Sequence, residues 1–366
     1  MMSDSKRCLS IHDTLVNTQD VSEIIKGSKN VCVGMGFVVL DAIYRKHDQP
    51  DFLAGGSCGN VLTILSYLGW DSYPVVRLGK DVEGDRIIED MKRWKVKTKF
   101  IEQEKGSASP IIIQKLSPRK KLGYRFYSKC EDGTWLPGWR TFLLKSLEAI
   151  QDKVPKANVF YFDRVSPSAL EMARNQKKQG AIIFFEPTQI LWDDKEFLKC
   201  LQISDIVKYS YNPKVPVNRS ILKDVPIEIQ TMGKDGIRYR SKLLKQRTWE
   251  KLNAFPISNL VDDAGSGDWV SAALISTLGR YKLSDIRYTA IEEALGFGQL
   301  LAYLNCQFVG ARGMMYSLPL LRIFSLIRRA YYGRTVQVGV PDRGPRKTIL
   351  AKKCRVCSGS KARRNK

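Results

Sequence analysis

The sequence predicts an α/β fold with a central, mostly parallel sheet flanked by helices, and three observations carry this prediction. The chain has 366 residues, of which 43% are hydrophobic, so it can bury a substantial core in one large domain or two smaller ones. Between residues 158 and 185 a strand, a helix and a second strand follow one another, and this alternation implies right-handed crossovers between parallel strands. Residues 261–275 join a glycine-rich turn to a buried apolar helix.

The elements follow from the spacing of apolar residues along the chain. Residues 1–29 are expected to form a polar leader with a short helix at 21–26. The first strand continues into an apolar run that ends in Asp41, and Gly55 and Gly56 open the first long helix. The predicted strands cover 30–34, 73–78, 97–102, 110–116, 123–127, 158–162, 181–185 and 227–232. The predicted helices cover 84–94, 167–179, 268–275, 291–304 and 318–332.

Charge is spread unevenly along the chain. The 60 Lys and Arg residues outnumber the 37 Asp and Glu residues, which gives a formal net charge of +23. Residues 322–366 alone hold fourteen Lys and Arg residues against the single acid Asp342. Cations at this density can bind phosphate backbones, but the segment has no evident means of reading bases. We therefore expect a flexible basic tail after Gly333, with weak nucleic-acid contact at most.

Several classes of protein are excluded by composition. The only histidines are His12 and His47, so a Ser-His-Asp triad or a multi-histidine metal site lacks its residues. Eight cysteines without framework spacing indicate reduced thiols and a cytoplasmic protein. Cys354 and Cys357 have the spacing of half a zinc site, but no second pair follows. No apolar run has the length of a membrane span.

The segment 261–269 (VDDAGSGDW) carries the clearest chemical signal. Its glycines let backbone N–H groups converge on an anion, and a helix that begins there adds the positive end of its dipole. Asp268 follows in the first helical turn. This suits phosphoryl transfer, because the amides can hold the moving phosphate and the carboxylate can take the proton of a hydroxyl group. The alternative is a helix N-terminus that carries Gly, Ser and Asp only as capping residues.

Two further sequence patterns connect this segment to a known family. Residues 262–268 resemble the second signature of the PfkB (ribokinase-like) sugar and nucleoside kinases, with Asp263 in place of the usual threonine and Ser266 in place of alanine. The segments 55–60 (GGSCGN), 65–69 and 78–85 resemble the first signature of that family. Weaker similarity at 231–236 and 310–313 extends the resemblance over residues 30–318.

The resemblance implies a fold and a division of the chain. The fold is a ribokinase-like three-layer sandwich, a mostly parallel sheet flanked by helices, with a small β lid formed by about 42–54 and 105–130. The leader would cover 1–29 and the kinase domain 30–318, and 319–366 would hold a terminal helix and the basic tail. The implied cofactors are ATP and Mg²⁺, and the lid could join two copies as a homodimer.

The resemblance also assigns roles to single residues. Asp268 would be the catalytic base, and the backbone from Ala264 to Gly267 would form the anion hole. The residues implied for catalysis are Asp268, Gly265, Ser266 and Gly267. Those for the substrate are Asp41, Gly55, Gly56 and Asn60, those for the nucleotide are Thr231, Gly233, Gly236 and Ala264, and Glu186 would serve the metal. As a bare sequence, the strand at 227–232 with the glycine turn at 233–236 is only a hairpin, and 55–68 is only a capped helix.

The chain departs from the family pattern at two places. Pro213 stands where the family has a metal-organising glutamate, and Glu186 begins a segment that is usually Asp-Pro-Asn. The turn at 310–313 would either close over the adenine or leave Arg312 at the surface. The predicted function is ATP-dependent phosphorylation of a hydroxyl group on a furanose-type sugar or nucleoside. The alternative is a non-catalytic, ligand-binding relative that its tail tethers to nucleic acid.

Overall fold

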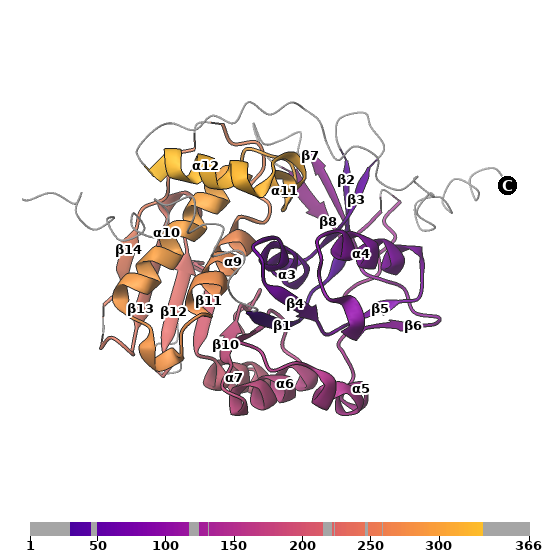
Figure 1. The fold of residues 1–366 in the computed structure, drawn as a ribbon. Helices are drawn as coiled ribbons and strands as arrows, with labels where there is room; N and C mark the ends of the chain where they lie inside the picture. The colour runs from indigo at the N-terminus through magenta and orange to yellow at the C-terminus, as the bar shows by residue number, and fades with distance from the viewer. Residues whose placement is uncertain are drawn as a thin grey trace, which may run out of the picture.

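The structure is a computed structural model that describes residues 30–44, 50–116, 124–130, 132–214, 222, 224–245, 248–257 and 259–331. Its centre is an eight-stranded sheet with the order β14-β13-β12-β11-β10-β9-β1-β4 (Figure 1). These strands are β1 (Val31–Met35), β4 (Asp71–Pro74), β9 (Val159–Phe162), β10 (Ile182–Phe185), β11 (Ile206–Ser210), β12 (Ile227–Thr231), β13 (Ile237–Ser241) and β14 (Glu250–Leu252).

Six strands of this sheet, from β4 to β12 in the spatial order, run parallel. Strand β13 runs antiparallel to β12, and β14 runs antiparallel to β13. The prediction of a mostly parallel sheet is therefore confirmed. The strands from 159 to 185 are apolar throughout because helices cover both faces of the sheet. In β9, Val159 and Tyr161 pack into the core on one face, and Phe160 and Phe162 pack into the core on the other.

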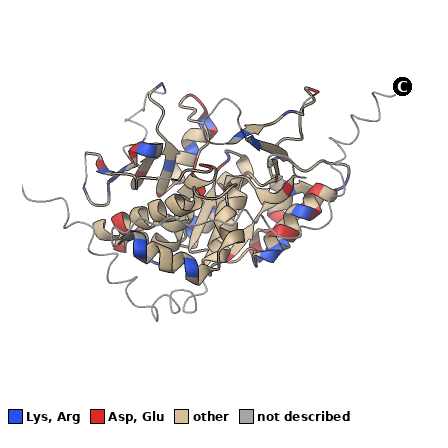
Figure 2. Ribbon diagram, turned by 90° about the horizontal axis from the view of Figure 1, so that it is seen from above, with Lys and Arg blue, Asp and Glu red and all other residues tan. Residues whose placement is uncertain are grey.

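Helices form the two outer layers (Figure 1). One layer consists of α5 (Leu144–Ile150), α6 (Pro167–Lys178) and α7 (Lys195–Ile203). The other contains α3 (Ser57–Tyr67), α9 (Ser266–Leu278), α10 (Tyr288–Asn305), α11 (Gly313–Ser317) and α12 (Leu320–Tyr331). Helix α12 shares this core through Ile323, Leu326 and Ile327. Figure 2 shows Lys, Arg, Asp and Glu mainly on the outer helices, whereas the central helices are almost free of them.

A second, four-stranded sheet stands at one end of the molecule, where the resemblance implies a lid (Figure 1). It consists of β3 (Asp51–Gly55), β2 (Val39–Tyr44), β7 (Ile111–Leu116) and β8 (Tyr124–Tyr127), in that order. Helix α4 (Val82–Arg93) packs against β2 and β3 at its base. A two-stranded sheet of β5 (Val76–Gly79) and β6 (Ile101–Glu104) lies beside it.

The structure corrects three predicted elements. The strand predicted at 73–78 is interrupted at Val75, whose amide bonds to the carbonyl oxygen of Gly34; the chain then leaves the central sheet, and β5 pairs with β6 instead. The strand predicted at 97–102 begins with a 3₁₀ turn over Thr98–Phe100. Asp41 does not end the first strand, because the chain turns at Gly36 and Asp41 lies inside β2 of the lid sheet.

Other predictions fall on parts of the chain that the structure does not describe. These are the leader with its helix at 21–26, the basic tail after Gly333, and the pair Cys354 and Cys357. Within the described residues, Cys32, Cys58, Cys200 and Cys306 are buried free thiols. In the same part of the chain, no helix combines the length and the apolar character needed to cross a membrane.

Candidate active site

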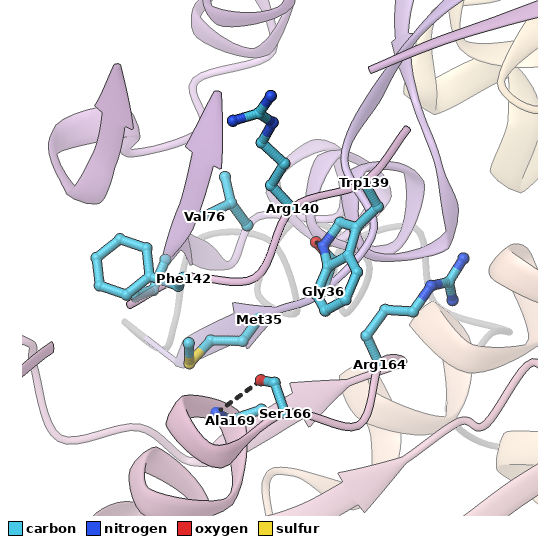
Figure 3. Close-up of a pocket in the computed structure, with 10 residues that line it drawn as sticks. Met35, Gly36, Val76, Trp139, Arg140, Phe142, Arg164, Ser166 and Ala169 are labelled. Carbon is cyan, nitrogen blue, oxygen red and sulfur yellow. Dashed lines mark hydrogen bonds between the residues drawn. The ribbon is translucent and has the colours of Figure 1, made fainter. Parts of the chain in front are cut away.

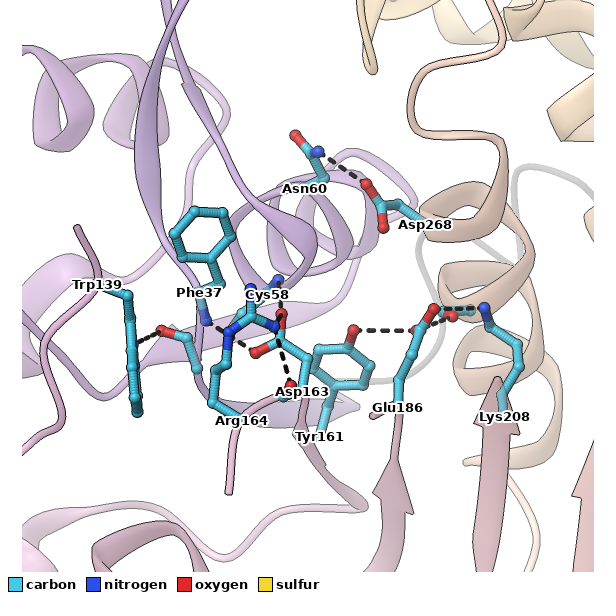
Figure 4. A network of polar contacts seen from close by, with 12 residues as sticks. Phe37, Cys58, Asn60, Trp139, Tyr161, Asp163, Arg164, Glu186, Lys208 and Asp268 are labelled. Carbon is cyan, nitrogen blue, oxygen red and sulfur yellow. Dashed lines mark hydrogen bonds and ion pairs between the residues drawn. The ribbon is translucent and has the colours of Figure 1, made fainter. Parts of the chain in front are cut away.

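The candidate site lies where several strands of the central sheet end. Asp163 directly follows β9, Glu186 directly follows β10, and Lys208 lies in β11. In Figure 4 their side chains lie below those of Asn60 on α3 and Asp268 on α9. The carboxyl ends of parallel strands are the usual position for ligands in open α/β sheets, because helix N-termini open at the same edge.

The glycine-rich loop before α9 has the geometry of an anion site. Gly265 is the N-cap of α9 with φ 72°, and a Cβ there would lie 2.5 Å from Ala311, so only glycine fits. The amide of Ala264 already bonds to Asp262 Oδ1 at 3.1 Å, and that of Ser266 to the carbonyl oxygen of Asp263 at 3.3 Å. Within the described residues, the free amides at this helix end belong to Gly265, Gly267 and Asp268. Of the four amides expected to hold an anion, those of Ala264 to Gly267, only the amides of Gly265 and Gly267 are free, and the amide of Asp268 joins them.

Asp268 lies in the first turn of α9 and is buried. The side-chain amide of Asn60 donates to its Oδ2 at 2.7 Å. Burial raises the pKa of Asp268 to about 8, and the nearby carboxylate of Glu186 adds to the rise, whereas Asn60 and Lys208 oppose it. A carboxyl group with this pKa can exchange a proton near neutral pH. The structure thus joins Asn60 and Asp268, which the resemblance assigned to separate roles.

Glu186 and Lys208 form an ion pair (Figure 4), with Lys208 buried and Glu186 partly buried. Only 2% of the Lys208 side chain is exposed, and its Nζ lies 3.6 Å from the position that a Cβ on Gly267 would take. Both oxygens of Glu186 are engaged, Oε1 with Lys208 and Oε2 with the hydroxyl groups of Tyr161 and Ser271. The ammonium group places a fixed positive charge behind the anion site.

The arrangement does not form a metal site as the side chains lie. Among the described residues, no three His, Cys, Asp or Glu side chains gather as a metal cluster. Glu186, which the resemblance assigns to the metal, has both oxygens occupied by protein donors. Pro213, at the place of the usual glutamate, offers no ligand side chain.

Asp163 is a buried carboxylate that the sequence reasoning missed. Its two oxygens accept the amides of Phe37 at 2.8 Å and Cys58 at 3.1 Å, so it ties the turn after β1 to the start of α3. Burial raises its pKa to about 7, against the opposing charge of Arg164. A Cβ on Gly36 would lie 1.7 Å from Asp163 Oδ1, which explains the glycine there. The available signal was an aspartate directly after an apolar strand.

One face of the lid sheet is turned toward the glycine loop. Gln114 on β7 donates to Asp262 Oδ2 at 2.7 Å, and Asp262 precedes α9. Asp41 pairs with Ile112, and Gln114 pairs with Phe126. Because residues two apart in a strand and residues paired across strands share a face, these four side chains lie on the same face. Phe126, on the edge strand, is 56% exposed.

Asp41, Gly55 and Gly56 lie together where the lid meets α3. Asp41 is buried, and burial raises the pKa of its carboxyl group to about 7 while Arg312 opposes the rise. A Cβ on Gly55 would lie 2.0 Å from Asp41 Oδ2, so glycine makes room for this carboxylate. Gly56 is the N-cap of α3 with φ 78°, and a Cβ there would lie 2.4 Å from the carbonyl oxygen of Phe37.

The alternative that Arg312 lies at the surface is wrong. Its side chain is only 2% exposed and forms an ion pair with Asp90 on α4. Its Nε donates to Asn60 Oδ1 at 3.1 Å. The turn at 310–313 folds back against the start of α9, where Trp269 Nε1 donates to the carbonyl oxygen of Ala311 at 3.0 Å. A lone arginine between glycines gave no signal of this burial.

The residues expected to bind the nucleotide lie on the next hairpin of the sheet. Thr231 ends β12 and pairs with Ser210 at the carboxyl end of β11. A 3₁₀ turn over Gly233–Asp235 then connects β12 to β13, as predicted. Gly236 has φ 94°, and a Cβ there would lie 2.1 Å from the carbonyl oxygen of Leu252. A Cβ on Gly233 would meet nothing within 4 Å, so its surroundings are open.

A small hollow next to Gly36 is distinct from this site (Figure 3). Its volume is about 10 Å³, which is room for roughly one water molecule. Trp139 forms one of its walls and donates from Nε1 to the carbonyl oxygen of Gly36 at 2.9 Å. The guanidinium groups of Arg140 and Arg164 point away from it (Figure 3). The hollow is too small for a sugar.

Comparison with known proteins decides the family. The family model described as pfkB family carbohydrate kinase matches residues 28–210, half of the chain. The chain belongs to the pfkB family of carbohydrate kinases. An uncharacterized sugar kinase of Pyrococcus horikoshii is 26% identical to this kinase over 297 residues, which cover 74% of this chain and 84% of the relative.

Solved structures show the same fold. The structure of the Pyrococcus horikoshii sugar kinase matches with a TM-score of 0.58 over 77% of this kinase and 93% of that chain, at 21% identity. Aminoimidazole riboside kinase from Salmonella enterica matches with a TM-score of 0.63 at 18% identity, over 81% of this kinase and 99% of that chain. Fructokinase from Xylella fastidiosa matches with a TM-score of 0.64 at 15% identity, over 83% of this kinase and 100% of that chain. The ribokinase-like three-layer fold is therefore confirmed.

Proposed function

We propose that this pfkB-type kinase transfers the γ-phosphoryl group of ATP to a hydroxyl group of a furanose-type sugar or nucleoside, with Asp268 as the general base. One observation carries the proposal. Asp268 is buried beside the free amides of Gly265 and Gly267, and it faces Asn60 of the other signature segment. A proton acceptor and an anion site thus lie at one helix N-terminus.

The reaction follows from these positions. The acceptor hydroxyl group gives its proton to a carboxylate oxygen of Asp268 as its oxygen attacks the γ-phosphorus atom. The bond between that phosphorus atom and the bridging oxygen of ADP breaks, and ADP leaves with the electron pair. The free amides, the dipole of α9 and the ammonium group of Lys208 stabilise the negative charge that spreads over the transferred group.

The nucleotide is proposed to lie over the hairpin of β12 and β13, at Thr231, Gly233 and Gly236. The open surroundings of Gly233 support this position, because backbone without a Cβ can approach a ligand closely. Related kinase structures contain ATP or ADP. Mg²⁺ bound with a nucleotide usually keeps several waters and takes one or two carboxylates besides the phosphate oxygens.

The acceptor is proposed to bind between the lid and α3. The carboxyl group of Asp41 can accept hydrogen bonds from hydroxyl groups. Among the described residues, no donor reaches this carboxyl group. Ile112 and Phe126, on the same lid face, offer apolar surface to a sugar ring or a base. Kinases of similar fold act on aminoimidazole riboside, fructose and ribose, as their names state. Compounds of this class are the first to examine.

The test is a screen for acceptor-dependent ADP release. Purified protein would be incubated with ATP and a panel of free sugars and nucleosides, with Asp268→Asn protein as the matched control. One or more furanose compounds should raise ADP release in the wild type and leave the variant at background. If no acceptor raises release above ATP alone, while calorimetry still detects a bound sugar or nucleoside, the chain is a non-catalytic binding protein.

A further inference from the structure

A buried arginine lies behind the residues proposed to hold and activate the acceptor. Arg312 precedes α11, and its Nη2 donates to Asp90 Oδ2 at 2.7 Å and to the carbonyl oxygen of Ala54 in β3. Its Nε reaches the side chain of Asn60 on α3. One guanidinium group therefore connects the lid, α4 and the first turn of α3.

Asp90 fixes this guanidinium group in place. The carboxylate of Asp90 also accepts the hydroxyl group of Tyr316 at 2.8 Å and 3.0 Å, and the amide of Ala54 at 3.0 Å. The ring of Tyr316 lies 5.6 Å from the centre of the guanidinium group. A buried charge without a partner is strongly unfavourable, so Arg312 stays with Asp90. Because the guanidinium group is planar and its Nη2 is held by Asp90, the N–H of Nε can point only toward Asn60.

The orientation of the Asn60 side chain follows from this arrangement. Arginine has only donors, so the end of the Asn60 amide that faces Arg312 has to be the carbonyl oxygen. The distance between Arg312 Nε and Asn60 Oδ1 is 3.1 Å. The NH₂ group of Asn60 then faces Asp268, at 2.7 Å. If the amide were flipped, a donor would face a donor and an acceptor would face an acceptor.

Arg312 also affects Asp41. Its positive charge is the largest influence that opposes the effect of burial on this carboxyl group. Within the described residues, Asp41 has no hydrogen-bond donor, and Nη1 of Arg312 is buried without an acceptor. Arg312 thus contacts Asn60, which faces the proposed base, and opposes the pKa rise of Asp41, which is proposed to bind the acceptor.

We propose that Arg312 is a positioning residue for phosphoryl transfer, which turns the amide of Asn60 toward Asp268 and provides the counter-charge for Asp41. This inference rests on the proposed function, in which Asp268 is the base and Asp41 binds the acceptor. Arg312 itself touches neither the acceptor nor the transferred group. It acts through the residues that do.

A double-mutant cycle tests the path through Asn60. The variants are Asn60→Ala, Arg312→Gln and the two together. Misplacement of reacting groups lowers rates by roughly 10–100-fold, and we expect kcat to fall by about this factor in each single variant. Because Arg312 acts on the base through Asn60 and on acceptor binding through Asp41, the kcat of the double variant should be no lower than that of Asn60→Ala alone. Losses that multiply in the double variant would overturn the proposal.

The fold of these variants has to be controlled. Arg312→Gln leaves Asp90 buried without a cation, so Arg312→Lys serves as the second variant if the first does not fold. Lysine keeps the charge but lacks the fork that reaches Asp90 and Asn60 together. The matched control is Arg77→Gln, which removes an arginine paired with Glu104 in the small sheet of β5 and β6. The control should keep its kcat, and a fall equal to that of Arg312→Lys would overturn the assignment.

A measurement without turnover separates this inference from the proposed function. The pKa of Asp268 would be followed by carboxylate ¹³C NMR in the wild type and in the Arg312 variants. The hydrogen bond from Asn60 lowers the pKa of Asp268, so loss of the amide orientation should raise it. An unchanged pKa would refute the role of Arg312, whatever the activity. If the wild type phosphorylates no acceptor, the proposed function fails, and this titration still reports on the positioning.

Discussion

The side-chain amide of Asn60 donates to the carboxylate of Asp268 at 2.7 Å, although 208 residues separate the two in the chain. The contact arises because α3 and α9 pack against each other on the same face of the sheet. Both helices begin at the edge where the parallel strands end. A segment expected to bind the acceptor and a segment expected to perform the chemistry therefore form one site.

The first prediction concerns the role of Asp268 as base. Asp268→Asn keeps the size of the side chain and removes the proton acceptor, so kcat should fall by about 10²–10⁴-fold. The affinity for ATP, measured by calorimetry, should change only a few-fold, because the amides of Gly265 and Gly267 remain. Near-wild-type turnover in this variant would eliminate Asp268 as the base.

The second prediction concerns the pH dependence of catalysis. Burial raises the pKa of Asp268 to about 8, and only its ionised form can take a proton. The value of kcat/KM, which reports on the free enzyme, should therefore rise with pH and level off above about pH 8. Below about pH 7 the slope should become steeper, because Asp41 is then protonated as well. A flat profile from acid to alkaline pH would contradict the assignment of both carboxyl groups.

The third prediction concerns the effect of Asp268 on stability. Its pKa is raised in the folded protein, so between the ordinary pKa of 3.8 and about 8 the folded state holds a proton that the unfolded state has lost. Its contribution to stability is present at low pH and is lost as pH rises through this window, at no more than about 1.4 kcal/mol per pH unit. Asp268→Asn removes this contribution. Its melting temperature should exceed that of the wild type at pH 8, and the gap should close toward pH 4; equal differences at both pH values would contradict the pKa.

The architecture was predictable because it depends on local patterns. The apolar runs of β9 and β10 with the helical spacing of α6 between them indicate a parallel unit wherever they occur. Asp268 and Asn60 were predictable because each follows glycines that open a helix. Such signals lie within a few neighbouring residues.

The remaining parts of the site depend on contacts between distant segments. Asp163 is buried by the turn after β1 and by α3, and Arg312 by α4 and the lid. Arg312 does not differ in its own sequence surroundings from a surface residue, and Asp163 is marked only by the apolar strand directly before it. The break between β4 and β5 has the same cause, since β6 pairs with β5 from another part of the chain. Charge partners for buried groups cannot be chosen before the fold brings them together.

The fourth prediction concerns Asp41 and the acceptor. Loss of a charged hydrogen-bond partner costs about 1.5–3 kcal/mol, so Asp41→Ala should weaken acceptor binding by roughly 10–150-fold. The affinity for ATP should stay close to that of the wild type, because Asp41 lies in the lid sheet and the proposed nucleotide hairpin is β12 and β13. Titration calorimetry with each ligand measures both constants. An equal loss for the two ligands would mean that Asp41 only supports the fold.

The fifth prediction concerns the basic tail, which lies outside the described residues. Residues 334–366 hold eleven Lys and Arg residues against the single acid Asp342, so they can bind phosphate backbones without reading bases. Deletion of this segment should leave kcat unchanged, because α12 completes the apolar core before it begins. It should also abolish retention of the protein on DNA or RNA.

Gel shifts of the full-length and truncated proteins, side by side at low and moderate salt, measure this effect. Retention of the full-length protein should fall steeply with salt, because the release of condensed counterions drives it, with a slope of about 0.9 per phosphate contacted. A variant with every Lys and Arg of 334–366 changed to Gln keeps the length and should behave like the truncated protein. If the truncated protein is still retained, the cations of the kinase body bind the nucleic acid. If truncation destroys turnover, the tail belongs to the active enzyme, and the domain boundary at residue 319 is wrong.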